Sequence, residues 1–221
     1  MRYLPWVKPT VFLACFIPLG LLGFNAYTDN LGANPIEVIT RSTGTWTLVF
    51  LLLTLAVTPL RKLSGWQGLI KLRRMLGLYA FFYACLHFTT YVWLDQFFDW
   101  QGMIQDVVKR PFITAGLTSF MLLIPLALTS TTGMIRRLGK HWQALHRLVY
   151  LIALGGVVHY LWLVKADRRQ PLIYGAILML LLGYRVVVKW RPKQLRIQRK
   201  PATRNSPSEP MPARVAKGVL A

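Results

Sequence analysis

Six apolar stretches separated by polar connections dominate the pattern of the 221-residue chain. They cover roughly residues 10–27, 45–60, 75–94, 112–129, 145–164 and 171–190, and the second is the shortest. A helix needs about 17 to 25 predominantly apolar residues to cross a bilayer. The pattern therefore predicts an all-α membrane protein built as a six-transmembrane-helix bundle.

The connections between these stretches are short, which bounds the domain organisation. The longest, near 28–44 and 95–111, leave no room for a soluble catalytic domain, and no internal repeat is evident. We expect one transmembrane domain over 1–190 and a basic, disordered cytoplasmic tail over 191–221, where the composition is polar and rich in proline. The first stretch lacks a small-x-small cleavage site, so we expect it to be a retained helix and not a signal peptide.

Composition and charge placement support this reading. The chain is 54% hydrophobic and 15% charged, with a mean hydropathy of +0.41, which excludes an ordinary soluble domain. If the first span starts inside, 21 of the 27 Lys and Arg residues fall on the inner side and six on the outer side. This asymmetry follows the positive-inside rule and predicts that both termini are cytoplasmic. The net charge of +20 then faces membrane lipids, and no nucleic-acid partner is needed.

Two of the four histidines lie at matching depths inside apolar spans. His87 comes 13 residues after Arg74, and His159 comes 12 residues after Arg147, on two helices that both run outward. At 1.5 Å per residue, both imidazoles are about 18 to 20 Å above the inner boundary. Two neutral imidazoles from different helices can ligate one haem iron from opposite sides, as in b-type cytochromes. No CxxCH motif for covalent haem attachment occurs.

A second, inner site is suggested by His146, which lies 13 residues before His159. The corresponding position on the third helix is Arg73, 14 residues before His87, and a guanidinium is a poor iron ligand. His146 would then be the sole histidine ligand of an inner haem, with His141 as an alternative donor. The candidate propionate partners are Arg73, Arg74 and Arg147.

Helix periodicity complicates this two-site picture. At about 100° per residue, a 13-residue spacing places His146 roughly 140° away from His159 around a straight helix. Either the helix is irregular around Gly155-Gly156, or two haems lie on different flanks of it. Simpler readings stay open: the histidines could only hydrogen-bond neighbouring carbonyls or Thr hydroxyls, and the arginines could only be positive-inside anchors.

Two segments carry a resemblance to a known family. They are RRMLGLYAFFYACLHFTTYVW at 73–93 and HWQALHRLVYLIALGGVVHYLW at 141–162, the second containing W-x-x-L-H-R-L-x-Y from Trp142 to Tyr150. They resemble the ferric-reductase-like transmembrane domain and, within it, the MsrQ or YedZ family of haem-binding membrane subunits of bacterial periplasmic methionine sulfoxide reductase systems. Ferric reductases usually have two histidines on the third helix, whereas this chain has only His87 there.

The resemblance implies a multi-pass inner-membrane protein that binds haem b and FMN. It would pass electrons from the quinone pool or a cytosolic flavin reductase to a periplasmic molybdopterin methionine sulfoxide reductase that repairs oxidised periplasmic proteins. By position, His87 and His159 would ligate the iron of the outer haem, and His146 that of the inner one. We expect no catalytic residue in this chain and assign none to quinone or FMN. Two alternatives remain: a self-sufficient b-type cytochrome oxidoreductase of the ferric or cytochrome b561-like kind, and a haem-free membrane scaffold.

Overall fold

The computed structural model describes residues 4–165 and 167–190, and the predicted tail over 191–221 lies outside them. The elements in chain order are α1 (Leu4–Ala14), α2 (Ile17–Tyr27), α3 (Pro35–Ser64), η1 (Gln67–Leu69), α4 (Ile70–Thr90), η2 (Tyr91–Asp95), α5 (Trp100–Lys109), α6 (Pro111–Leu128), α7 (Thr132–Leu138), α8 (Lys140–Leu145), α9 (Leu148–Leu163) and α10 (Arg169–Trp190). Within the described residues, six helical segments are long and apolar enough to cross a membrane, which confirms the six predicted spans.

The second span is the longest and not the shortest as predicted. Helix α3 has 30 residues and begins at Pro35, where the Asn34 side chain accepts a hydrogen bond from the backbone N–H of Glu37. Its outer half reads as polar because it contains several threonines, but Thr43 and Thr47 hydrogen-bond back to carbonyls of the preceding turn. Such internal bonds let hydroxyl residues sit in a membrane helix.

The first span is broken near its middle, between α1 and α2. The break falls at Cys15 and Phe16, shortly before Pro18. Two tyrosines of α4 donate hydrogen bonds to carbonyl oxygens at this break: Tyr79 to Phe12 and Tyr83 to Cys15, both at 2.9 Å. These bonds give the two carbonyl oxygens a donor that the hydrocarbon of a bilayer could not provide.

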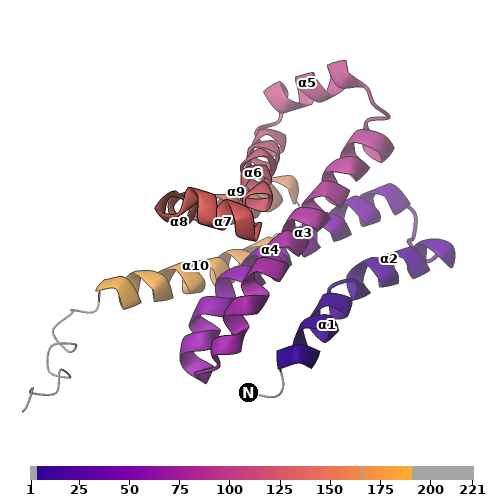
Figure 1. Cartoon of the computed structure of the whole chain (residues 1–221). Helices are drawn as coiled ribbons and strands as arrows, with labels where there is room; N and C mark the ends of the chain where they lie inside the picture. Colours follow the sequence, from indigo (N-terminus) through magenta and orange to yellow (C-terminus); the bar gives the residue numbers. More distant parts are fainter. Residues whose placement is uncertain (1–3, 166, 191–221) are drawn as a thin grey trace, which may run out of the picture. The chain divides into compact units, whose positions relative to one another are not determined.

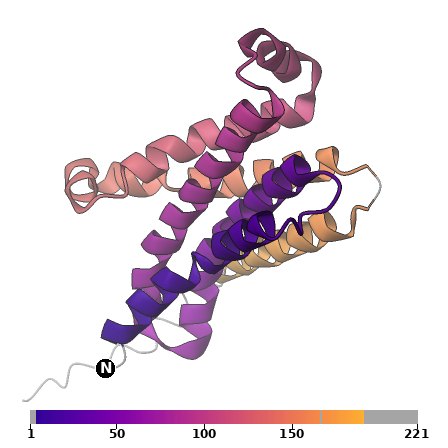
Figure 2. The same ribbon diagram turned by 90° about the vertical axis from the view of Figure 1, so that its right-hand side faces the viewer.

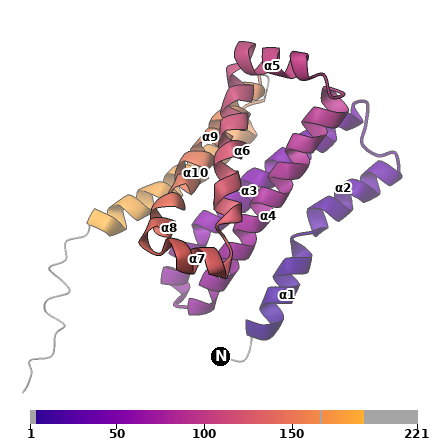
Figure 3. The same ribbon diagram turned by 45° about the horizontal axis from the view of Figure 1, so that its top comes forward.

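Two helix pairs form the centre of the bundle within residues 1–185. Helix α3 lies along α4, and α6 packs against α9; contacts of α3 with α9 and of α4 with α6 join the pairs (Figures 1 and 3). Aliphatic, small and aromatic side chains fill the centre: Leu55, Ala80 and Ala153 are fully buried, and Tyr83 and Phe50 are nearly so. These four helices carry the candidate site.

The end of the bundle that holds the connections 28–34 and 95–110 is here called the outer end, and the opposite end the inner end. At the outer end the predicted loop over 95–111 contains the short helix α5, which lies between the outer ends of α4 and α6 in Figures 1 and 3 and is seen nearly end-on in Figure 2. Asp99 caps α5 by accepting a hydrogen bond from the N–H of Gly102 at 3.0 Å. Its apolar face includes Trp100, Met103 and Ile104.

The chain divides into two compact units, Met1–Arg185 and Val186–Ala221. The boundary falls within α10, five residues before the predicted domain end at 190. The described part of the second unit is the last turn of α10, where Val186, Val187 and Trp190 are exposed. The proposed disorder of 191–221 stays a prediction.

Candidate functional site

The His87 imidazole is held by groups from the neighbouring helix α3. Its Nδ1 atom lies 2.9 Å from the carbonyl oxygen of Thr40. A carbonyl can only accept, so Nδ1 carries the proton and Nε2 presents a lone pair. One turn further along α3, Gly44 lies against the ring: a Cβ built there would be 2.9 Å from Cε1 of His87, closer than real Cβ contacts allow.

The His159 imidazole is held in the same way by helix α6. Its Nδ1 atom lies 2.6 Å from the carbonyl oxygen of Phe112, and a Cβ on Gly116 would be 2.7 Å from that Nδ1. Here too, the proton sits on Nδ1 and Nε2 is left free as a ligand. Both histidines thus have the tautomer that an axial iron ligand requires.

The structure brings the two imidazoles close together at the centre of the bundle. The ring centroids of His87 and His159 are 6.2 Å apart, and the ring planes are inclined by 75°. A metal–imidazole bond is about 2.0 to 2.1 Å long and the ring centroid lies about 1.1 Å beyond the nitrogen, so imidazoles on either side of one metal have centroids about 6.2 to 6.4 Å apart. The observed separation fits one metal ion between the rings.

A cavity of about 640 Å³ surrounds the two rings. It lies within the size range of cofactor sites. Its walls come from α3, α4, α5, α6 and α9 and are mostly aliphatic and aromatic, as a flat apolar macrocycle requires. The charged residues in its lining are Arg41, Asp95 and Arg110, all at the outer end, while Leu51, Ala84 and similar apolar residues line the inner part.

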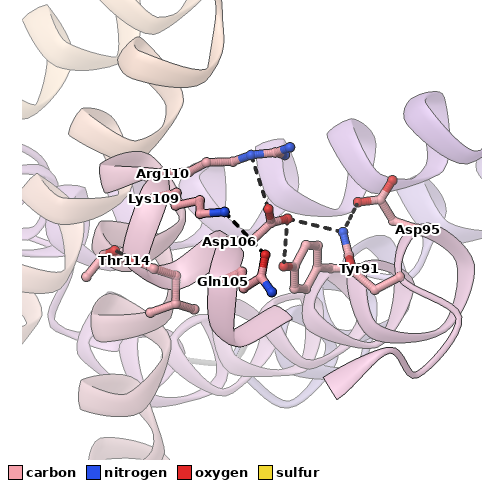
Figure 4. Close-up of polar contacts among 9 residues, drawn as sticks. Tyr91, Asp95, Gln105, Asp106, Lys109, Arg110 and Thr114 are labelled. Carbon is pink, nitrogen blue, oxygen red and sulfur yellow. Dashed lines mark hydrogen bonds and ion pairs between the residues drawn. The ribbon is translucent and has the colours of Figure 1, made fainter. Parts of the chain in front are cut away.

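Helix α5 covers the outer mouth of this cavity and is tied down by a polar network (Figure 4). The Asp106 carboxylate, with its side chain only 15% exposed, pairs with Nε of Arg110 at 3.2 Å. It also accepts hydrogen bonds from Nε2 of Gln96 at 3.2 Å and from the Tyr91 hydroxyl at 3.5 Å. Tyr91 and Arg110 themselves line the cavity. The network therefore connects the cap over the cavity to the cavity wall.

The fifth span is irregular near His146, and this corrects the expected position of the irregularity. Helix α9 runs without a break through Gly155-Gly156, whereas His146 and Arg147 form a turn between α8 and α9. The segment from His146 to His159 is therefore irregular, as one of the two alternatives required, but at its start and not at Gly155-Gly156. The His146 ring stacks on Trp142 with centroids 4.0 Å apart, and its Nδ1 lies 3.2 Å from the Trp142 carbonyl.

The inner-end candidates are not gathered as closely as the outer pair. The Nε2 atom of His146 is buried and has no hydrogen-bond partner within the described residues. Arg73 is half-buried and close enough to His146 for their charges to interact. Arg74, Arg147 and His141 are exposed. None of the predicted propionate partners lines the outer cavity.

Several residues of the site were missed by sequence reasoning. Gly44, Gly116, Arg41 and Arg110 carry no signal in a hydropathy pattern. One signal was available in the spacing: Phe112, Gly116 and His159 each lie 72 positions after Thr40, Gly44 and His87. The α3–α4 and α6–α9 pairs therefore build the same local arrangement around one histidine each, although no repeat is evident along the sequence.

Comparison with known proteins agrees with this site. The family model described as "Ferric reductase like transmembrane component" matches residues 43–157. The protein-methionine-sulfoxide reductase heme-binding subunit MsrQ of Herminiimonas arsenicoxydans is 60% identical over 190 residues, covering 85% of this chain and 87% of that protein. Proteins of the same name are 56% identical in Azospira oryzae, covering 86% of this chain and 82% of theirs, and 48% identical in Xanthomonas campestris pv. campestris, covering 93% and 94%.

No solved structure matches the chain. The family model covers just over half of the chain, from residue 43 to residue 157. This range includes His87, Gly44 and Gly116, but it leaves out Thr40 and His159. The relative from Herminiimonas arsenicoxydans covers 85% of the chain. The chain belongs to the MsrQ family of ferric-reductase-like transmembrane proteins.

Proposed function

We propose that this chain is the haem b electron-transfer subunit of a methionine sulfoxide reductase system, a multi-pass protein of the bacterial inner membrane. The observation that carries the proposal is the pair of imidazoles 6.2 Å apart inside an apolar cavity, each with Nδ1 committed to a backbone carbonyl. The names of the relatives supply the system to which a haem-binding subunit of this kind belongs.

The residues around the cavity fit a haem. His87 and His159 would hold the iron, and the aliphatic walls would take the macrocycle. Arg41 and Arg110, at the outer end, would pair with the propionates, because carboxylates are costly in the apolar inner part. Haem bound there would supply reversible one-electron chemistry at iron. The chain's own contribution is to fix ligand orientation and to exclude water from the ring.

His146 supports the proposal of a second, inner haem. Its orphaned Nε2 is an available ligand, and the nearby Arg73 would pair with a propionate. The exposed positions of Arg74 and Arg147 favour the positive-inside role for these two residues. With an inner cofactor near His146 and an outer one between His87 and His159, electrons would have a path along the bundle.

The finer parts of the proposal concern direction and partners. Both termini would be cytoplasmic, so that electrons enter at the basic inner end and leave at the outer end to a periplasmic molybdopterin reductase. The donor would be the quinone pool or a cytosolic flavin reductase. FMN enters through family resemblance alone, and no described residue is assigned to it.

The first test is a reduced-minus-oxidised visible spectrum of the full-length chain purified in detergent. We expect Soret and α bands of low-spin haem b; their absence would favour the haem-free scaffold. The second test follows haem reoxidation after stoichiometric reduction. We expect fast reoxidation only with both the periplasmic reductase and a methionine sulfoxide substrate. Equally fast reoxidation by ferric chelates alone would favour the self-sufficient oxidoreductase.

A further inference from the structure

Two groups of the neighbouring helix, a backbone carbonyl and a glycine, restrict the orientation of each imidazole. The hydrogen bond from Nδ1 to Thr40 or Phe112 fixes where the edge of the ring points. The glycine on the same helix, four residues further on, lets the backbone touch the ring and so fixes where its plane lies. An imidazole that is hydrogen-bonded at its edge and contacted by backbone on one face cannot rotate freely about its Cβ–Cγ bond.

The result is that the two ring planes cross. The His87 and His159 planes are inclined by 75°. In a low-spin ferric haem, each axial imidazole splits the two iron d orbitals that interact with its π system, along a direction set by the ring plane. Parallel planes add their splittings, whereas crossed planes largely cancel them. Ligand orientation set by surrounding groups is therefore a lever on the electronic state of the iron.

We propose that Gly44 and Gly116 are positioning residues that hold His87 and His159 in crossed planes across the outer haem iron. This inference rests on the proposed function, since it requires the haem. It goes further in that it assigns a spectroscopic state and a redox effect to two glycines that do not ligate the metal. Crossed planes leave the ferric state less stabilised than parallel ones, so the glycines keep the reduction potential of the outer haem higher.

General helix packing does not account for these two glycines. Gly156 lines the same cavity on α9, but a Cβ built there would meet Leu48 at 3.6 Å, an ordinary contact. Gly77, on α4, would meet only Thr54, at 3.9 Å. A methyl group is thus sterically excluded at Gly44 and Gly116 by the imidazole itself, and is tolerated at Gly156 and Gly77.

The test uses frozen-solution electron paramagnetic resonance and potentiometric titration of the purified full-length protein with haem bound. The wild-type protein alone tests the ring planes: we expect a strongly anisotropic low-spin signal with one large g value. In Gly44→Ala and Gly116→Ala, the displaced ring should reduce the largest g value, give a more rhombic signal and lower the midpoint potential, with haem content unchanged. Gly77→Ala on α4, at a position that does not line the cavity, is the matched control and should retain the wild-type signal and potential.

Three outcomes would overturn the inference. One is a rhombic wild-type signal, which means near-parallel planes. Another is an equal change in Gly77→Ala, which means a general packing effect. The third is haem loss in Gly44→Ala and Gly116→Ala but not in the control, which means that the glycines admit the haem and do not set the ring plane. A wild-type protein without any haem signal is a different result, because it refutes the proposed function itself.

Discussion

The Nη2 atom of Arg185, on α10, donates a 2.8 Å hydrogen bond to the carbonyl oxygen of Leu55 on α3. In a regular helix this carbonyl would accept from the N–H of the residue four positions later, but that residue is Pro59, which has none. Arg185 also donates from Nη1 to the Tyr150 hydroxyl of α9, at 2.6 Å. One guanidinium therefore replaces the missing helical donor and joins three helices.

Arg185→Met should destabilise the protein, because it leaves the Leu55 carbonyl unpaired in the bundle. The expected loss is about 1 to 3 kcal/mol, the cost of a buried polar group without its partner. Thermal unfolding in detergent, followed by intrinsic fluorescence, measures it. The matched test is Pro59→Ala, which restores the helical N–H, so the Arg185→Met penalty should shrink in that background. An equal penalty in both backgrounds would place the role of Arg185 elsewhere, for instance at Tyr150.

Replacement of the histidines should separate the two proposed sites. His87→Ala and His159→Ala should each lose the haem of the outer site, because one of its two iron ligands is removed. The amount of haem bound per protein should fall accordingly. His146→Ala should remove a different, inner fraction. Pyridine haemochromogen assays and visible spectra measure both. In His87→Gly, added free imidazole should restore the absorption band of the outer haem. It can occupy the space beside Gly44 that the His87 ring fills in the wild type. Equal losses in all three alanine variants would contradict two separate sites.

The six spans and the facing pair of histidines could be predicted because both depend on position along the helix axis. Hydropathy reports the length of a span, and the distance from a basic boundary reports depth, so His87 and His159 could be placed at one level from the sequence. A site also depends on which face of its helix each residue occupies. That face depends on packing partners, and the sequence alone does not identify them.

The errors follow from the same distinction. The outer half of α3 reads as polar, but Thr43 and Thr47 bond to their own helix, so the span was predicted too short. The irregularity of the fifth span falls at His146, where no glycine or proline marks it, and not at the conspicuous Gly155-Gly156. Arg41 and Arg110 fall in connections by hydropathy, and only the folded chain places them in the cavity lining.

The outer arginines should set the potential of the proposed outer haem. Arg41 pairs with Glu37 at 2.7 Å and Arg110 with Asp106 at 3.2 Å, and both arginines line the cavity. A cation near the ring favours the reduced iron, so Arg41→Gln and Arg110→Gln should each lower the midpoint potential. Both arginine side chains are about half exposed, so a unit charge about 10 Å from the iron contributes roughly 0.4 to 1.7 kcal/mol at effective dielectric constants of about 80 to 20, or about 20 to 70 mV.

Lys109 provides the matched control for the arginine variants. It is exposed, neighbours Arg110 in the chain and hydrogen-bonds Gln105 at 3.3 Å, but it does not line the cavity. Lys109→Gln should change the potential less than Arg110→Gln, because the Lys109 charge is not in the cavity lining and is separated from the haem by screening solvent. Spectroelectrochemical titration at one fixed ionic strength compares the variants. If Lys109→Gln lowers the potential as much as Arg110→Gln, the surface charge and not a propionate contact is responsible.

The Asp106 network should control access to the outer haem. Its carboxylate holds α5 against Gln96 and Tyr91, and α5 covers the cavity. Asp106→Ala should raise the population of a locally opened state, since opening no longer breaks these bonds. The oxidation of prereduced haem by aqueous ferricyanide should then accelerate at least severalfold in stopped-flow experiments, while the visible spectrum stays unchanged because Asp106 does not line the cavity. Gln101→Ala, an exposed change on the same helix, should react like the wild type. An unchanged rate in Asp106→Ala would mean that α5 stays closed without the network, held by its apolar face alone.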